Sequence, residues 1–426
     1  MISVVLISSI VLLLTLFFKI PAFIALLSGS ALYFMLQPHL PAQIAAQRVI
    51  AGIENVALLA IPFFVCSGII MNYSGVTTRV LRLGEVLMRR VPGGLAQVNV
   101  TLSVLMGGLS GSSLADAAMT SKMLVPEMEK RGFSKEFSSV VTATSAIITL
   151  LIPPAIAMII FGSVANVSIG RLFIAGIVPG LFLCLVLMVL VGVISSKRNY
   201  SKEVTTTVPL GKAVLDAFFP MLLPVIIIGG IRFGIFTPTE AGAIAIVYAV
   251  VLSIIYREFK AANMLRAIKE TVTTTAAIMM IIGAASAFAW VLTRERIPQQ
   301  ITEFMVANIG NRYIFLLSVN LFLLIIGMFI EGNALMIVLV PIFVPLARAF
   351  GIDDIHFGMI FIFNMAMGSL TPPIGTLTFV TCGVTRCKLK NFWKEAIPFY
   401  IALFCVLMLL TFFPPFTLAL VNLVWG

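Results

Sequence analysis

Long apolar runs recur along almost the whole chain, and they constrain its fold more than any other feature. Several of them approach or exceed the roughly 20 residues that an α-helix needs to cross a bilayer. The composition agrees, because 60% of the residues are hydrophobic and only 11% are charged, whereas soluble domains carry about 25% charged residues. The sequence therefore predicts an all-α, polytopic protein embedded in a lipid bilayer.

Most of the apolar runs are expected to be membrane spans, and two are expected to be re-entrant hairpins. The spans are predicted at residues 2–18, 20–36, 51–73, 134–165, 171–195, 209–231, 235–256, 272–292, 354–381 and 392–424. The stretches 92–126 and 313–346 are interrupted by Gly, Ser or Pro near their middles. Irregular backbone is tolerated at membrane depth only where protein or water satisfies it. Each of these two stretches is therefore expected to enter and leave on the same side.

The basic residues orient this arrangement. The clusters in segments 79–90, 130–135, 197–202, 257–269 and 386–394, which include Lys202, fall on one side together with Lys19. Cytoplasmic loops carry an excess of Lys and Arg, so this side is expected to be the cytoplasm. The same rule accounts for the net charge of +11 without a nucleic-acid partner. The amphipathic stretches at 79–90 and 257–269 are expected to lie along the cytoplasmic interface.

A weak repeat relates the two interrupted stretches at a constant offset of 219 residues, the separation between Pro153 and Pro372. The same offset pairs Pro126 with Pro345, and agreement by chance is the alternative. Each copy consists of a hairpin, a charged loop, a span broken at Pro-Pro and a further span. The charges that flank the two hairpins indicate that they open to opposite sides of the membrane, so the repeats are expected to be inverted. Inverted repeats with broken helices indicate a secondary transporter.

The first hairpin carries a tip rich in Gly and Ser. Its carbonyl and hydroxyl oxygens suit a hard cation, and the N-terminus of the helix that follows suits an anion. The candidate cation ligands are Ser110, Gly111, Ser112 and Ser113. Close helix packing through small residues is the alternative. Asp116 lies one turn further on, where an ionisable group is usually paired or functional, and a structural hydrogen bond is the alternative role for it.

The Pro-Pro pairs and the second tip supply the other candidates. Proline frees upstream carbonyl oxygens, which with Thr149, Thr371 and Thr376 would complete cation sites opposite the two tips, whereas a plain proline kink is the alternative. The second tip is less regular and carries Glu331, Gly332 and Asn333.

Two further charges near span ends, Glu240 and Arg296, are noted as well. Single residues of this kind are more often interface anchors, but an Arg near the cavity would neutralise a carboxylate substrate.

Motifs of other functional classes are missing from the sequence. It contains no phosphate-binding P-loop, no HExxH and no GxSxG, and these motifs carry nucleotide, zinc-protease and hydrolase chemistry. The two His and five Cys form no close set suited to a transition metal. We therefore expect no enzyme and no catalytic residues. An ion channel with re-entrant pore loops remains the main alternative, and an intramembrane enzyme using a carboxylate pair is a weaker one.

The motifs resemble the large membrane subunit of the TRAP transporters, which are tripartite ATP-independent periplasmic transporters. The resemblance rests on SGSSLADAA at 110–118, PEM at 126–128, RGF at 131–133 and GSLTPPIG at 368–375. It covers essentially the whole chain, although the second tip matches less well. It implies a sodium-driven, elevator-type carrier of the ion-transporter superfamily in the bacterial inner membrane.

The resemblance also implies partners, a substrate class and site residues. The partners would be a small membrane subunit of about four helices, expected as a separate chain, and a periplasmic substrate-binding protein. The substrate would be an organic acid, with sialic acid favoured over C4-dicarboxylates and other sugar or oxo acids. One sodium site would be formed by the first tip and the break before Pro153. The other would be formed by the second tip and the break that includes Gly368 and Thr371. Asp116, Glu240, Arg296 and Glu331 would be important to transport.

The expected organisation alternates scaffold with transport elements. The divisions are scaffold spans with an arm helix (1–91), the first transport repeat (92–165), scaffold spans with arm helices (166–312), the second transport repeat (313–381) and a C-terminal span (382–426).

Overall fold

The computed structural model describes residues 4–18, 20–200 and 208–425. Over these residues the secondary structure consists of helices and turns, without strands. Lys19 and Lys202, two of the basic residues used above for orientation, lie outside the described residues.

The helices follow one another with short connections. The first half contains α1 (Val4–Phe17), α2 (Ala22–Met35), α3 (Gln43–Ile53), η1 (Val56–Leu59), α4 (Ala60–Tyr73), α5 (Val76–Leu87), α6 (Gly94–Ser110), α7 (Ser113–Met123), α8 (Val125–Lys130), α9 (Lys135–Ser145), η2 (Ala146–Leu150), α10 (Ile156–Ala165) and α11 (Ile169–Lys197). The second half contains α12 (Leu210–Arg232), α13 (Pro238–Ile255), α14 (Ala261–Arg294), α15 (Ile297–Asn308), α16 (Arg312–Gly327), α17 (Gly332–Ala349), α18 (Asp354–Gly368), α19 (Thr376–Thr385), α20 (Leu389–Phe412) and α21 (Pro415–Trp425).

Within the described residues, 7 helical segments are long and apolar enough to cross a membrane. They are η1 with α4, α11, α12, α13, α14, α17 and α20. All but α17 match expected spans, and α17 belongs to the expected second hairpin. These helices have apolar outer faces. On α11, for example, Leu181, Leu185 and Val189 are 52%, 58% and 59% exposed. Such a face suits contact with lipid.

The structure corrects two boundaries and shortens the span expected at 20–36. The span expected at 392–424 divides into α20 and α21, because Pro414 and Pro415 supply no N–H to continue the helix. Of the basic stretch expected as an arm at 257–269, residues 261–269 instead form the start of a spanning helix, since α14 runs for 34 residues and its first 22 contain neither Gly nor Pro. Near the N-terminus, α2 has 14 residues, fewer than the roughly 20 that a span needs, and α1 has 14 within the described residues.

The structure confirms the internal repeat as a repeated order of helices. The helices α6, α7, α9, α10 and α11 correspond to α16, α17, α18, α19 and α20. The helices α7 and α17 begin 219 residues apart, at residues 113 and 332. The same separation holds for α9 and α18, which begin at residues 135 and 354. The two Pro-Pro pairs lie in equivalent breaks, between η2 and α10 and between α18 and α19, and both peptide bonds are cis.

In both copies of the repeat, the second helix of the hairpin packs on a helix of the other copy. The second hairpin helix of the first copy, α7, packs on α19 of the second copy, and its equivalent α17 packs on α10 of the first. The first hairpin helices pack within their own copy, α6 on η2 and α16 on α18. The two copies therefore share one interlocked core.

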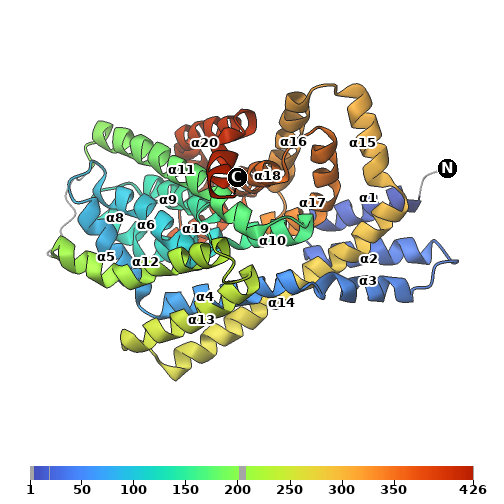
Figure 1. Ribbon diagram of the computed structural model, residues 1–426. Coiled ribbons are helices and arrows are strands. Elements are labelled where there is room, and N and C mark those ends of the chain that lie inside the picture. The colour runs from blue at the N-terminus through green and yellow to red at the C-terminus, as the bar shows by residue number, and fades with distance from the viewer. Residues whose placement is uncertain (1–3, 19, 201–207, 426) are drawn as a thin grey trace.

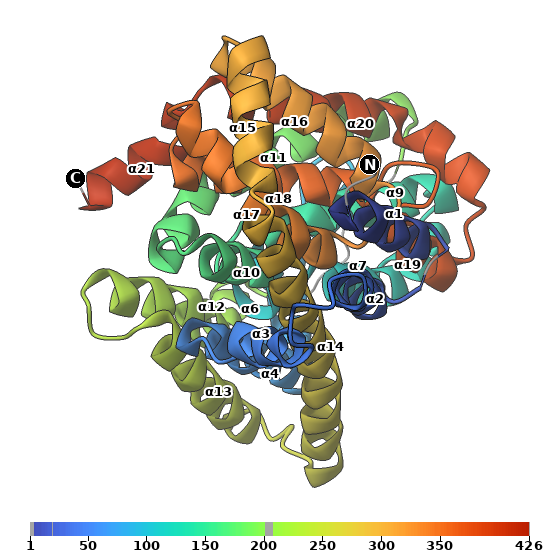
Figure 2. The same cartoon turned by 90° about the vertical axis from the view of Figure 1, so that its right-hand side faces the viewer.

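The remaining long helices surround this core. Figures 1 and 2 both show α3, α4, α13 and α14 grouped along one side of the molecule, and α14 packs on α2, α3 and α4. Contacts of α4 with α6 and of α14 with α17 join this group to the two hairpins. The space between the group and the hairpin tips holds the candidate site.

Candidate functional site

Each hairpin tip is held against a Pro-Pro break by a backbone hydrogen bond. At the first tip, the Ile156 N–H donates to the Gly111 carbonyl at 3.2 Å. At the second, the Gly375 N–H donates to the Met328 carbonyl at 3.1 Å. The two donors are equivalent in the repeat (156 to 375). The breaks thus supply the backbone groups that anchor the tips.

Glycine is required where the first tip meets its break. Gly111 has φ +60°, and a Cβ there would lie 2.6 Å from the Pro154 carbonyl oxygen. At the second copy, a Cβ on Gly327 would lie 3.2 Å from the Cα of Gly368. Both tips therefore approach the broken helices backbone to backbone.

Equivalent residues cap the second helix of each hairpin. The Ser112 side chain accepts a hydrogen bond from the Ala115 N–H at 3.4 Å, at the start of α7. The Glu331 carboxylate accepts one from the Ala334 N–H at 2.9 Å, at the start of α17. The N-termini of both helices are held in place in the same way, but one cap is neutral and the other is a carboxylate.

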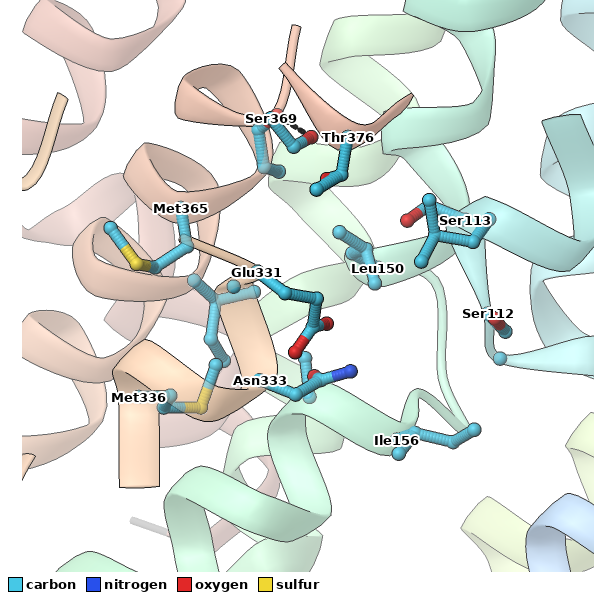
Figure 3. A pocket seen from close by; sticks show the side chains of 16 residues that line it. Ser112, Ser113, Leu150, Ile156, Glu331, Asn333, Met336, Met365, Ser369 and Thr376 are labelled. Carbon is cyan, nitrogen blue, oxygen red and sulfur yellow. Dashed lines mark hydrogen bonds between the residues drawn. The ribbon is translucent and has the colours of Figure 1, made fainter. Parts of the chain in front are cut away.

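A cavity of about 60 Å³ lies between the two tips. Residues from the first turns of α7, α10, α17 and α19 line it, namely Ser113, Ile156, Gly332 and Thr376. Figure 3 shows Glu331 and Asn333 pointing into this space from one side, with Ser112 and Ser113 on the other. Four helix N-termini thus meet at one small cavity, and a helix N-terminus favours negative charge.

A second cavity of about 540 Å³ lies next to the first. The tips contribute Ser110, Ser112, Glu331 and Asn333 to its lining. The opposite wall comes from α4 and α14 and carries the polar side chains of Asn72, Thr273 and Thr274. The volume falls within the roughly 300–1,000 Å³ typical of small-molecule sites.

No Lys, Arg or His is among the residues that line either cavity in the described chain. An anion there would meet helix N-termini and hydroxyl and amide groups. Over the same residues, no group of three His, Cys, Asp or Glu side chains could hold a metal ion.

Most of the candidates at the tips lie together. Gly111, Ser112, Ser113, Gly332, Asn333 and Thr376 line the small cavity, and Ser110 lines the larger one. The Ser110 hydroxyl is of particular interest, because the residue is 8% exposed and its Oγ has no hydrogen-bond partner in the described structure.

The candidates upstream of the breaks do not line either cavity with their side chains. The Thr149 hydroxyl donates to the Ala146 carbonyl at 2.8 Å, and that of Thr371 donates to the Met367 carbonyl at 2.7 Å. Gly368 packs on Gly327. Each threonine hydroxyl keeps oxygen lone pairs for a cation when it donates its hydrogen, whereas Gly368 offers only its backbone oxygen.

The structure places Asp116 in a buried polar network behind the tip. The residue is 1% exposed, and the Ser103 hydroxyl donates to its Oδ2 at 2.9 Å. The Ser145 hydroxyl lies 3.1 Å from the Ser103 hydroxyl and donates to Oδ1 of Asn99 at 3.4 Å. Asp116 lines neither cavity.

Two other charged candidates lie on the surface. Glu240 forms a capping box with Thr237 at the start of α13 and is exposed. Arg296 is exposed in the turn between α14 and α15. Neither residue lines the cavities.

Sequence reasoning did not single out Asn72, Thr273 or Thr274. The sequence gives only a weak indication that these residues line a site, because each is simply a polar residue within or at the end of an apolar span. Only the fold shows that α4 and α14 bring them to one wall.

The fold is that of a helical membrane protein with two adjoining cavities between its repeats. The chain superposes on the solved YdaH transporter of Alcanivorax borkumensis with a TM-score of 0.63 and 13% sequence identity, covering 89% of this chain and 88% of that one. At this identity the likeness shows the fold alone.

The family follows from the sequence comparisons. Residues 9–416 match the model of the family described as tripartite ATP-independent periplasmic transporter, DctM component. The sialic acid TRAP transporter large permease protein SiaM of Vibrio cholerae is 38% identical over 96% of this chain and 97% of its own length. The C4-dicarboxylate TRAP transporter large permease protein DctM of Pseudomonas aeruginosa is 37% identical over 93% of each chain. The chain therefore belongs to the TRAP transporter family as a large permease component.

This membership confirms the resemblance seen in the sequence. The relatives are transporter permeases, so neither the ion-channel alternative nor the intramembrane enzyme gains support. The two relatives are about equally identical to this chain yet are named for different acids. Identity alone therefore does not choose the substrate.

Proposed function

We propose that this chain is the permease of a sodium-coupled importer of organic acids. The observation that carries the proposal is the meeting of four helix N-termini and two Gly-containing tips, the first also rich in Ser, at cavities that no basic residue of the described chain lines. An organic anion in such a site needs helix N-termini and co-bound cations to balance its charge.

Sodium would bind where the tips meet the breaks. A hard cation prefers carbonyl and hydroxyl oxygens, and both junctions bring backbone carbonyls of a tip and of a break together. The unpartnered Ser110 hydroxyl supplies a further oxygen at the first junction. A cation there would lie next to the anion cavity, so that the two ligands would stabilise each other's binding.

The transport movement would follow the elevator scheme. The exchanged packing of α7 on α19 and of α17 on α10 supports movement of both hairpins and both broken helices as one body. Such movement keeps their irregular backbone satisfied, whereas unwinding against lipid would expose it. The inverted, re-entrant arrangement of the hairpins belongs to this proposal, because inverted repeats commonly carry the site in alternating-access carriers.

The importer would be assembled from three parts in the bacterial inner membrane. The family description, a component of a tripartite periplasmic transporter, supports a small membrane subunit and a periplasmic substrate-binding protein as partners. Sialic acid remains our favoured substrate, with C4-dicarboxylates and other sugar or oxo acids as alternatives.

Reconstitution tests the proposal. The chain, a candidate small subunit and a candidate binding protein are placed in proteoliposomes, and uptake of labelled N-acetylneuraminate or succinate is followed. We expect saturable uptake that needs an inward sodium gradient and all three proteins. Uptake that is indifferent to sodium would refute the coupling, and substrate-independent ion current would favour a channel.

A further inference from the structure

The two hairpins present equivalent helix N-termini with different charge. At α7 the cap is the neutral Ser112, whose contact with the Ala115 N–H is long at 3.4 Å. At α17 the cap is Glu331, whose carboxylate accepts from the Ala334 N–H at 2.9 Å and also contacts Asn333. Because first-turn N–H groups lack partners within their own helix, α7 can still accept an anion, whereas α17 already holds one.

Glu331 is also the single ionisable side chain among the residues lining the larger cavity in the described chain. No lining Lys, Arg or His offsets its charge. A ligand carboxylate is therefore favoured at the α7 end and repelled at the α17 end.

The larger cavity has polar side chains on both of its walls. The Ser110 Oγ beside the α7 N-terminus and the Asn72 Oδ1 on the opposite wall have no hydrogen-bond partner in the described structure. Both residues line the cavity, and Thr273 and Thr274 lie on the same wall as Asn72. The amide of Asn72 and the hydroxyls of Thr273 and Thr274 therefore give this wall the polar groups that hydroxyl or amide groups of a ligand need as partners.

We propose that this permease selects acids with one carboxylate and several hydroxyl or amide groups, and that Glu331 rejects dicarboxylates. The inference rests on the proposed function and narrows its substrate class. The ligand carboxylate meets the N-terminus of α7 and the sodium beside Ser110. Its hydroxyl or amide groups face Asn72 and the α14 threonines, and a second carboxylate would meet Glu331 with no basic partner.

Two probes with the same carbon skeleton test this inference. Gluconate carries one carboxylate and a hydroxylated chain, and glucarate carries a second carboxylate in place of the terminal alcohol. The purified full-length chain is titrated with each acid in sodium buffer, and the thermal unfolding midpoint gives an apparent Kd. N-acetylneuraminate serves as a larger monocarboxylate probe. We expect the monocarboxylates to bind at least about tenfold more tightly than glucarate, a difference of about 1.4 kcal/mol.

Variants assign the discrimination to the proposed residue. Glu331→Gln keeps an oxygen for the helix cap, and Glu331→Ser copies the equivalent Ser112, so both should fold and both should narrow the gluconate-to-glucarate ratio. Asp353→Asn is the control, because Asp353 also caps a helix with its carboxylate but lines neither cavity. It should leave the ratio unchanged.

The possible failures are distinct. Equal or tighter binding of glucarate by the unmodified chain would overturn the inference alone, as would an unchanged ratio in both Glu331 variants. If none of the three acids shifts the midpoint in sodium, the cavity is not an organic-acid site, and the proposed function fails with the inference.

Discussion

Ser112 and Glu331 occupy equivalent positions in the two repeats and line the same cavity. Each residue precedes the second helix of its hairpin, and each side chain accepts a hydrogen bond from the backbone three residues on, at Ala115 and Ala334. The repeat therefore conserves the backbone geometry while changing the charge. The two helix N-termini are thus equivalent in backbone geometry and different in charge, and in our proposal this difference orients a bound anion.

The Ser110 hydroxyl is predicted to be a sodium ligand. Because its Oγ lacks a partner, Ser110→Ala should cost little folding stability but raise the sodium concentration that half-stabilises the purified chain, by about tenfold for a lost interaction of about 1.4 kcal/mol. Sodium titrations of the thermal unfolding midpoint measure this change. Ser8→Ala is the matched control, since Ser8 is also a buried serine with an unpartnered hydroxyl but lies in α1. Similar sodium dependence in both variants would mean that Ser110 only packs.

Gly111 is predicted to tolerate no side chain. In Gly111→Ala the new Cβ would lie 2.6 Å from the Pro154 carbonyl oxygen at φ +60°, so we expect a loss of about 3 kcal/mol or more. Gly132→Ala is the control, because its φ is +87° but nothing lies within 4 Å of the added Cβ, and it should cost only about 1–2 kcal/mol. Thermal unfolding of both variants checks the difference. Equal losses would show that the tip can move away from its break.

Much of the fold was predictable from the sequence because the decisive signals are local. The Pro-Pro pairs end helices wherever they occur, and the Gly- and Ser-rich run at 110–113 forms a turn at the expected place. The Thr237-Pro-Thr-Glu240 sequence is itself a capping-box signature, and the structure shows that box at the start of α13. A structural role for Glu240 was therefore available from the sequence.

The composition of the cavity could not be predicted in the same way. Asn72 and Thr273 come from α4 and α14, about 200 residues apart, and no local pattern brings them together. The orientation of Asp116 was equally hidden, because α7 has polar residues on more than one face and only packing on α6 shows that this carboxylate points to Ser103.

Asp116 is predicted to have a structural role, although the family resemblance implies a part in transport. Asp116→Asn retains an oxygen that accepts from Ser103, so it should fold and support uptake. Asp116→Leu removes the carboxylate acceptor, leaves the Ser103 hydroxyl only the longer contact with Ser145 at 3.1 Å, and should cost about 1–3 kcal/mol. Unfolding midpoints and sodium-driven uptake are compared for the two variants. Normal folding of Asp116→Asn with abolished uptake would assign the carboxylate charge to transport instead.

The first hairpin is predicted to move against α12 during transport. In the present conformation a Cβ on Gly108 would lie 3.2 Å from the Cβ of Pro224, close to the roughly 3.5–4.5 Å of a disulfide. The pair Gly108→Cys and Pro224→Cys, in a chain whose five native cysteines are replaced, should therefore form a disulfide under mild oxidation.

Because the crosslink would join a transport element to the surrounding helices, it should abolish sodium-driven uptake, and reduction with dithiothreitol should restore it. Each single-cysteine variant under the same oxidation is the control for damage unrelated to the crosslink. Gel mobility after proteolysis between α6 and α12 measures the extent of linkage. If the linked protein transports at the rate of the reduced one, the hairpin does not travel past α12, and a fixed site with moving gates replaces the elevator scheme.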